Sequence, residues 1–181
     1  MKVNVLPNIE FLNECFHYID ETGELFWNAR PLAHFKSFRD QCVFNDRFEN
    51  KPAGYLSSDG YRRVHVLKRM VLVHRIAYFM KHGEQPQMVD HIDGNRSNNR
   101  MENLRSATHS ENNLNAPARS YNKSGIKGVY FHKDTGKWQA QVNHNGKHKY
   151  LGLFKSISEA EAVAISFRST VHGEFANHGR R

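Results

Sequence analysis

Apolar and polar residues recur with clear periods along the N-terminal part of the chain, and these periods predict its secondary structure. Apolar residues recur at helical spacing over 9–19, which predicts a short amphipathic helix. Beyond it we expect a turn at 20–23 and a strand at 25–27. A hairpin should follow, with strands at 53–56 and 61–66 on either side of a turn. A helix should then run over 73–82 and end at Gly83. Residues 30–50 show no such period, so we expect them to be irregular.

Strand patterns and one helix pattern follow a polar, proline-containing stretch at 116–124. We expect strands at 126–132, 137–143 and 148–154, and Asn145-Gly146 between the last two is a strong hairpin signal. A helix should run from Ser156 or Ser158 to about His172, with Ser158 and Glu161 as its capping box. The pattern therefore predicts a linker at 116–124 and a sheet-and-helix domain over 125–177.

The segment 88–115 combines a short apolar strand pattern with closely spaced polar residues. Residues 88–91 and 104–107 read as two strands, and the Asn-rich stretch 95–102 between them reads as a loop. Thr108 and Glu111 then form a capping box that opens a helix. Strand, loop, strand and helix would bring Asp90, His91 and Asn112 to one point.

These residue types suit phosphodiester hydrolysis. The carboxylate of Asp90 and the amide oxygen of Asn112 are ligands for one Mg²⁺ or Mn²⁺ ion, with water and phosphate completing an octahedron. His91 can take a proton from an attacking water, because imidazole titrates near neutral pH. Asn103 would hold either the loop or the His91 ring. His109, on the same helix as Asn112, is a candidate for supporting the site or contacting phosphate.

Two simpler interpretations compete with this site. An Asp-His pair is often only a surface or capping pair. Asp93-Gly94-Asn95 also evokes a calcium loop, but the twelfth position counted from Asp93 is Leu104, where such a loop needs glutamate. The calcium interpretation therefore fails.

The spacing of Asp90-His91, Asn103 and Asn112 resembles that of the HNH endonucleases, most closely the phage and intron-encoded homing-type branch. The resemblance covers about 74–115 and implies a ββα-metal (His-Me finger) core. It implies His91 as general base, Asp90 and Asn112 as metal ligands, and Asn103 as the structural asparagine. It also implies action in the cytoplasm of a bacterial host.

Charge separates the two parts of the chain. Residues 116–181 carry 11 Lys and Arg against 4 Asp and Glu, whereas residues 1–115 carry 15 against 14, within a net charge of +8. A basic C-terminal part indicates a polyanionic partner, although a merely solvated basic surface would look the same. Cys15 and Cys42 are too few for a four-thiolate zinc site, so we expect no structural zinc and read both as free thiols in a reducing compartment. We expect neither a signal peptide nor a membrane span, because the apolar cluster 70–80 is broken by His74 and Arg75.

The alternation within 125–177 predicts which side chains face outward. Trp138, Ala140 and Val142 should pack on the helix, as should Leu151 and Leu153. The opposite face would collect polar and aromatic side chains, which are Tyr130, His132, Gln141, Asn143, His148 and Tyr150. Lys127 would join this face if Gly128 hosted a β-bulge. Such a face can contact bases in a major groove while lysines hold phosphates.

Several motifs of this domain resemble the APETALA/ethylene-response-factor DNA-binding domain. They are Ser124–Tyr130, Gly136-Lys137-Trp138, Tyr150–Phe154 and Glu159-Ala160-Glu161-Ala162. The resemblance implies a three-stranded sheet in the major groove. Tyr130, His132 and His148 stand where that family commonly has arginines, so the target sequence does not carry over.

The sequence thus predicts an α+β protein with a nuclease domain at 1–115 and a three-stranded sheet packed on one helix. Its predicted function is metal-dependent cleavage of double-stranded DNA, as a monomer or a DNA-induced dimer. Two rivals are a non-catalytic DNA-binding regulator with a degenerate nuclease motif and a structural RNA-binding protein. The intact Asp90, His91, Asn103 and Asn112 speak against the regulator.

Overall fold

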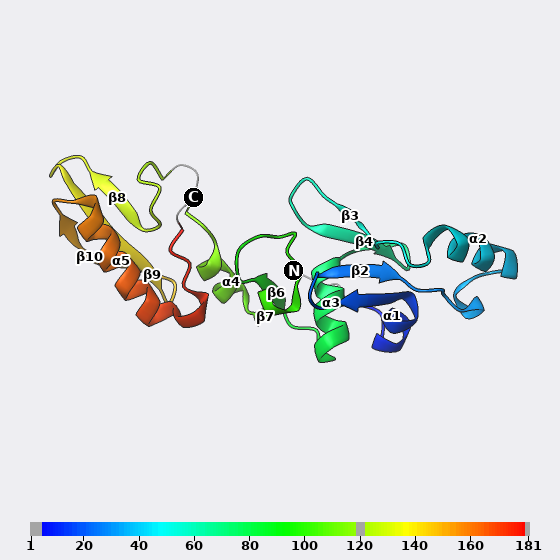
Figure 1. The fold of residues 1–181 in the computed structure, drawn as a ribbon. Coiled ribbons are helices and arrows are strands. Elements are labelled where there is room, and N and C mark those ends of the chain that lie inside the picture. Colours follow the sequence, from blue (N-terminus) through cyan, green and yellow to red (C-terminus); the bar gives the residue numbers. More distant parts are fainter. Residues whose placement is uncertain (1–4, 119–121, 180–181) are drawn as a thin grey trace. The chain divides into compact units, whose positions relative to one another are not determined.

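The chain mixes helices and strands, as the α+β prediction requires, and divides into two compact units (Figure 1). The computed structural model describes residues 5–118 and 122–179. Unit 1 ends at Thr108 and unit 2 begins at His109. The domain limits predicted from the sequence stay a prediction, and residues 119–121 of the predicted linker lie outside the described residues.

Unit 1 is built from two antiparallel hairpins and one small sheet around helix α3. Its elements in chain order are α1 (Ile9–Cys15), β1 (Phe16–Ile19), β2 (Glu24–Trp27), the 3-10 turn η1 (Leu32–His34), α2 (Phe38–Phe48), β3 (Tyr55–Leu56), β4 (Arg62–Val66), β5 (Arg69–Leu72), α3 (Val73–His82), β6 (Met88–His91), the 3-10 turn η2 (Met101–Asn103) and β7 (Leu104–Ala107). β1 pairs with β2 and β6 with β7, and β3, β4 and β5 form a sheet in that order. The predicted hairpin around 57–60 and the predicted strands at 88–91 and 104–107 are confirmed.

The predicted helix over 9–19 is wrong in its second half. The helix ends at Cys15, and Phe16 begins β1, where it pairs with Trp27. Aromatic and β-branched residues such as Phe16, Tyr18 and Ile19 fit a pleated strand well. Pairing with β2 therefore overrides a helical spacing that continues through Ile19.

Residues 30–50 are not irregular as expected, because they contain η1 and α2. Ser37 caps α2 by accepting a hydrogen bond from the Asp40 amide. No residue of α2 is buried, so the helix lacks the apolar stripe that would have revealed it. It is held through Phe44 and Phe48, whose rings lie 5.3 and 6.2 Å from that of Trp27. Strand β5 was also missed.

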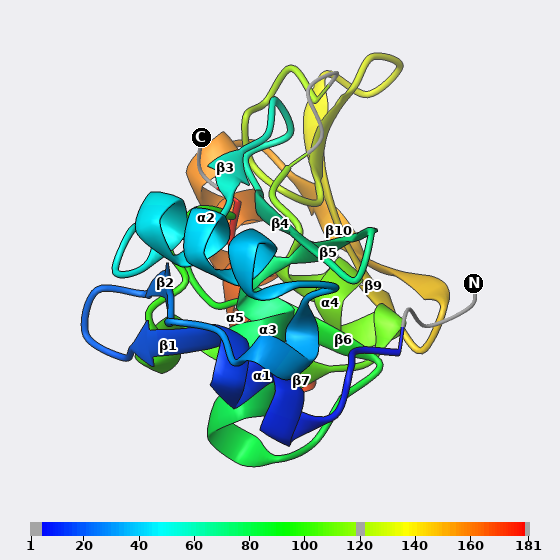
Figure 2. The same ribbon diagram turned by 90° about the vertical axis from the view of Figure 1, so that its right-hand side faces the viewer.

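Helix α3 lies at the centre of unit 1 and contacts both of its cores (Figures 1 and 2). The helix spans the predicted residues and ends at Gly83, which adopts a left-handed conformation. The larger core joins α3 to α1 and the first strands through buried side chains of Leu12, Cys15, Phe16, Leu25, Val64, Val66, Val73, Ile76 and Phe79. The smaller core joins Ala77 and Tyr78 to Val89 and Leu104 beneath β6 and β7. α3 thereby fixes the hairpin that carries the predicted catalytic residues.

Unit 2 contains a three-stranded antiparallel sheet with one long helix on its inner face. Its elements are α4 (His109–Asn115), β8 (Val129–His132), β9 (Lys137–His144), β10 (Lys147–Phe154), α5 (Ile157–His172) and the 3-10 turn η3 (Gly173–Phe175), with β9 in the middle of the sheet. Ala160 and Ala164 of α5 pack on Val129, Ala140 and Val142. The predicted helix and the inward alternation of β9 are confirmed, as are the three strands, except that the first begins at Val129 and not at residue 126.

One inward assignment on β10 is wrong. The register shifts between Tyr150 and Gly152, so Leu153 pairs with Gln139 on the outer face and Phe154 joins the core with Trp138. A β-bulge reverses the parity of every residue after it. The structure thus has a register shift on β10. A bulge at Gly128, which lies just before β8, stays a prediction.

The N-terminus of α5 offers a test of its capping. Ser156 is the N-cap, and Glu159, not Glu161, completes the capping box. Ser156→Ala should lower the free energy of unfolding by about 1 kcal/mol, because it removes the acceptor for an end-of-helix amide. Chemical denaturation measures this, and Ser158→Ala is the matched control that should cost much less. Equal losses from both variants would contradict the assignment.

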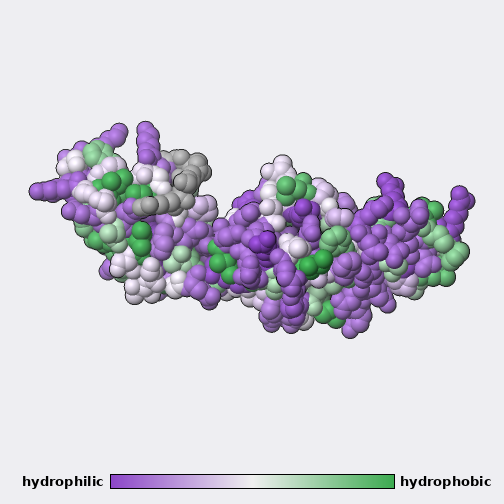
Figure 3. Space-filling view, in the orientation of Figure 1, coloured by the Kyte–Doolittle hydropathy of each residue, from purple (hydrophilic) through white to green (hydrophobic). Residues whose placement is uncertain are grey.

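Within the described ranges, no helix is both long and apolar enough to span a membrane. Hydrophilic side chains prevail on the face shown in Figure 3, and apolar side chains lie in scattered spots on it. Cys15 is buried and Cys42 is exposed, and both are free thiols.

Candidate active site

The β6–β7 hairpin buries the Asp90-His91 pair at its end. Asp90 lies opposite Arg105 and His91 opposite Leu104 in the register of the two strands. Asp90 is 5% and His91 4% exposed, although both are polar. Buried polar side chains need specific partners, so their contacts define the chemistry of the site.

Asp90 forms an ion pair with Arg105 across the hairpin. The Nε and Nη2 atoms of Arg105 donate to the same carboxylate oxygen, Oδ2, at 3.0 and 2.8 Å. Both side chains are largely buried, at 6% and 11% exposure. The pair keeps the carboxylate in place and partly offsets its negative charge. Sequence reasoning missed Arg105, because its role follows from the cross-strand register.

His91 lies in a group of aromatic rings inside unit 1. Its Nε2 atom is 3.0 Å from Oδ1 of Asn99, and its ring meets that of His74 edge-on at 4.8 Å. The ring of Tyr61 lies 6.0 Å away. Burial lowers the pKa of His91 below its ordinary value. Burial, followed by the nearby His91, lowers the pKa of His74 to about 3. Both imidazoles are therefore neutral at neutral pH, and a neutral His91 can accept a proton.

Asn103 is bonded to the loop that follows β6. Its Oδ1 accepts from the Asp93 amide at 2.9 Å, and its Nδ2 donates to Asp93 Oδ1 and to the Asn98 carbonyl at 2.9 and 2.8 Å. Burial acts to raise the pKa of Asp93, but the bonds from Asn98 and Asn103 outweigh it and lower the pKa. Of the two roles expected for Asn103, these contacts match the bracing of the loop.

Asn112 and His109 lie on α4, which belongs to unit 2. They are three residues apart, so they share one face of that helix. Asp90, His91 and Asn103 are brought together on the hairpin of unit 1. The approach of α4 to this hairpin remains a prediction from the sequence.

Comparison with known proteins identifies the segment that holds this hairpin. The sequence pattern of the HNH endonuclease family matches residues 71–114, from the end of β5 into α4. The chain contains an HNH endonuclease domain. The matched segment includes Asp90, His91, Asn103 and Asn112.

Two viral relatives extend the similarity beyond the HNH domain. Protein 3.8 of Escherichia phage T7 is 38% identical over 90 residues, which cover 49% of this chain and 72% of the relative, so the chain belongs to the same family. The Uncharacterized HNH endonuclease L560 of Acanthamoeba polyphaga mimivirus is 32% identical over 125 residues, covering 67% of this chain and 64% of the relative. No solved structure matches the chain significantly.

The described carboxylates of the HNH domain cannot hold a divalent metal by themselves, and other ligands would have to complete its coordination. Among the described residues, no cluster of three or more His, Cys, Asp or Glu side chains is placed to hold a metal. Asp90 is the buried carboxylate at the motif, and Arg105 already occupies one side of it. Amide, water and phosphate oxygens would have to supply the remaining ligands, which suits the hard cations Mg²⁺ and Mn²⁺.

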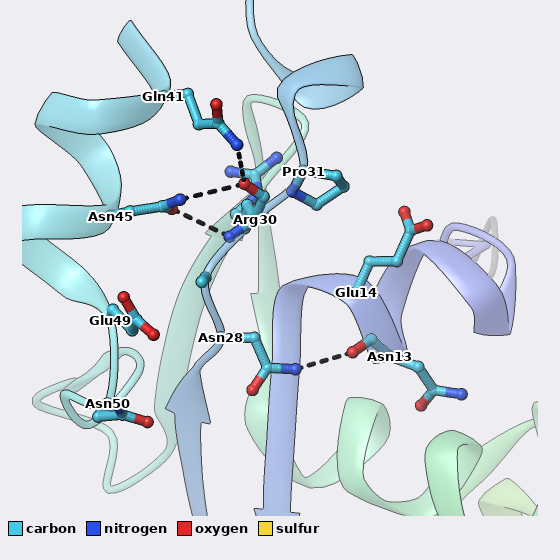
Figure 4. Close-up of a pocket in the computed structure, with 10 residues that line it drawn as sticks. Asn13, Glu14, Asn28, Arg30, Pro31, Gln41, Asn45, Glu49 and Asn50 are labelled. Atoms are coloured by element: carbon cyan, nitrogen blue, oxygen red, sulfur yellow. Dashed lines mark hydrogen bonds between the residues drawn. The ribbon is translucent and has the colours of Figure 1, made fainter. Parts of the chain in front are cut away.

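A hollow in unit 1 is lined by residues of the N-terminal region (Figure 4). It measures about 590 Å³ and is lined by residues 13–14, 28–31, 41, 45 and 49–50. Arg30 packs within 5.0–6.0 Å of the rings of four aromatic residues there, and Asn45 and Gln41 bond its main chain. None of the predicted catalytic residues lines it.

In unit 2, the predicted DNA-reading face lies along a groove of about 910 Å³. The groove is lined by five of the seven predicted contacts, which are Lys127, Tyr130, Gln141, Asn143 and His148. The register places Tyr130 opposite Gln139, Tyr150 opposite Gln141, and His148 opposite Asn143. His132, opposite Lys137, and Tyr150 lie on the sheet outside this groove.

Lys127 has a different environment from the one expected for a phosphate contact. Its ammonium group donates to the carbonyls of Leu114 and Ala116 at 2.6 and 2.5 Å. Burial, followed by the charge of Arg168, lowers the pKa of Lys127 to about 8. Arg168 is itself 1% exposed and donates to the Lys127 carbonyl. Lys127 thus ties the end of α4 and the residue that follows it to the sheet domain, and its DNA contact stays a prediction.

Proposed function

We propose that the chain is a metal-dependent endonuclease that hydrolyses phosphodiester bonds in double-stranded DNA. The observation that carries this proposal is the buried Asp90-His91 pair within the HNH domain. Burial keeps His91 neutral and ready to accept a proton, while Arg105 holds the adjacent carboxylate.

In this proposal, Asp90 and Asn112 would hold one Mg²⁺ or Mn²⁺ ion. A bound ion would supply positive charge that stabilises the phosphate and the departing 3′ oxygen. Because Arg105 offsets part of the Asp90 charge, the site gains a strong ligand set only when a DNA phosphate arrives. We therefore expect weak metal binding by the free protein.

His91 acts as the general base. It takes a proton from a water molecule as the water oxygen bonds to phosphorus, and the bond from phosphorus to the 3′ oxygen breaks. The 3′ oxygen then takes a proton from solvent. Asn103 keeps the loop after β6 folded so that this geometry persists. His109 supports the site or contacts a phosphate from α4.

Unit 2 reads the duplex in this proposal. Residues 125–177 form a domain like that of the APETALA/ethylene-response factors, joined by a linker at 116–124. Polar and aromatic side chains on the outer face of the sheet enter the major groove. The net positive charge of this part of the chain supports contact with a polyanion.

One active site per chain produces a nick, and a double-strand break requires a DNA-induced dimer. The proposal includes a homing-type role. It also includes action in the cytoplasm of a bacterial host, which the relationship to a phage protein supports.

Nicking of supercoiled plasmid tests this function. Purified protein with Mg²⁺ or Mn²⁺ should convert supercoiled to open-circular DNA, and chelation by EDTA should stop the reaction. Asp90→Ala and Asn112→Ala should each lower the rate about 100-fold or more, because each removes a metal ligand. Asn113→Ala, the neighbouring exposed asparagine on α4, is the matched control and should retain activity.

If the protein binds a specific DNA sequence but cleaves DNA with none of the metals tried, the nuclease proposal is contradicted and the regulator is favoured. Cleavage that EDTA leaves unchanged would contradict the metal assignment.

A further inference from the structure

The contact between His91 and Asn99 fixes more than the place of the imidazole ring. Asn99 is 1% exposed, and its Oδ1 faces Nε2 of His91 at 3.0 Å. An amide oxygen can only accept a hydrogen bond, so Nε2 must carry the proton in this contact. Nδ1 of His91 then keeps its lone pair, which is the form that a general base requires.

Stability does not account for the position of the Asn99 side chain. Its Nδ2 is buried and has no hydrogen-bond partner among the described residues. A buried amide nitrogen without a partner is unfavourable. Asn99 keeps its hydrogen bond to His91 although its buried Nδ2 is left without a partner among the described residues. This unfavourable arrangement indicates that the contact has a role in function.

The main chain of Asn99 is held by the N-terminal hairpin. The hydroxyl of Tyr18 in β1 donates to the Asn99 carbonyl at 2.6 Å, and the Met101 amide donates to the Asp20 carbonyl at 3.2 Å. Burial, followed by the nearby Asp20, raises the pKa of Tyr18, so its hydroxyl stays protonated as a donor. Lys81 of α3 pairs with Asp20 and anchors the same turn.

Gly23 shows how closely the hairpin approaches this loop. Gly23 has a φ of +73°, and a Cβ atom there would lie 2.4 Å from the Arg100 nitrogen and 2.5 Å from the Asn99 carbonyl carbon. Only glycine allows two stretches of main chain to lie this close. Tyr18 and Gly23 both lie outside the segment 71–114 that matches the HNH family.

We propose that Asn99 is a positioning residue that holds His91 in its Nε2-protonated tautomer, and that the β1–β2 hairpin holds Asn99 through Tyr18. The inference rests on the proposed role of His91 as general base. The N-terminal region, which lies outside the matched HNH segment, would then help to fix the tautomer of His91. The edge-on ring of His74 limits rotation of His91, while Asn99 selects which nitrogen carries the proton.

The tautomer is measured directly by ¹⁵N NMR of the histidine rings in the full-length, metal-free protein. Long-range ¹H–¹⁵N correlations at about pH 8 distinguish the two tautomers, and a His91→Gln sample assigns the signal. Wild-type His91 should show a protonated Nε2 and an unprotonated Nδ1. Asn99→Ala should show a mixture of tautomers, whereas Asn99→Asp, which keeps an acceptor, should restore the wild-type form.

Plasmid nicking supplies the second readout. Asn99→Ala should lower kcat by about 10- to 100-fold with KM little changed, and Asn99→Asp should recover part of the loss. Tyr18→Phe should give a smaller loss in kcat, and Tyr55→Phe, at an exposed site on β3, is its control. Thermal melting of each variant checks that the protein is folded.

The two proposals fail in different ways. A wild-type His91 protonated on Nδ1, or an Asn99→Ala variant with an unchanged tautomer, overturns the positioning role even if the protein cleaves DNA. An inactive wild-type protein with the expected tautomers would overturn the nuclease proposal and leave the positioning of His91 standing.

Discussion

His91→Ala is expected to lower the rate of DNA cleavage by about 10²- to 10⁴-fold while leaving the affinity for DNA unchanged. The loss follows because no other group is assigned to take the proton from the attacking water. The ring centre of His74 lies 4.8 Å from that of His91. Burial lowers the pKa of His74 to about 3, which makes it a weak base, so we do not expect it to replace His91. Single-turnover nicking of supercoiled plasmid measures the rate, and fluorescence anisotropy measures the affinity.

His82→Ala is the matched control, since His82 is an exposed histidine at the end of α3. That variant should cleave at the wild-type rate. Equal cleavage by His91→Ala and His82→Ala would remove His91 from the role of base. A fall in affinity that matches the fall in rate would place His91 in binding instead.

Gly128→Ala is expected to destabilise unit 2 by about 3 kcal/mol. Gly128 has a φ of +80°, and a Cβ atom there would lie 2.2 Å from the Gln141 carbonyl oxygen. The left-handed backbone accounts for about 1 kcal/mol of the loss, and the clash with the main chain of β9 for about 2 kcal/mol. Chemical denaturation followed by circular dichroism and by tryptophan fluorescence measures the loss.

Gly136→Ala separates the two causes. Gly136 also has a positive φ, of +64°, but nothing lies within 4 Å of a Cβ atom there. It should cost only about 1 kcal/mol. Gly128→Ala should also weaken DNA binding at temperatures where unit 2 is partly unfolded. Equal destabilisation by the two variants would contradict the close approach of the chain at Gly128.

The periodic elements could be predicted from the sequence, and those set by tertiary contact could not. α3 carries a strong apolar face and the Gly83 end signal, so its limits were predicted correctly. The boundary between Cys15 and Phe16 depends on pairing with β2, which helical spacing cannot reveal. α2 buries none of its residues and therefore has no apolar stripe to detect. Leu153 changed face because a single bulge reverses the alternation that follows it.

The candidate site shows the same division. Asp90, His91 and Asn103 stand out in the sequence because their residue types and spacing suit one chemistry. Asn99 and Arg105 had no such signal, because their roles arise from the folded loop and from the cross-strand register. The Asn-rich composition of 95–103 predicted a loop, but it did not indicate which asparagine faces the histidine.

Manganese in a crystal of the full chain bound to duplex DNA would show whether Asp90 and Asn112 share one metal ion, because Mn²⁺ is located by its anomalous scattering. We expect one peak per chain, about 2.0–2.2 Å from an oxygen of Asp90 and from the amide oxygen of Asn112. The Nδ1 atom of His91 should face the water next to the scissile phosphate. A peak that contacts neither Asp90 nor Asn112, in a crystal where the DNA is cleaved, would contradict the account.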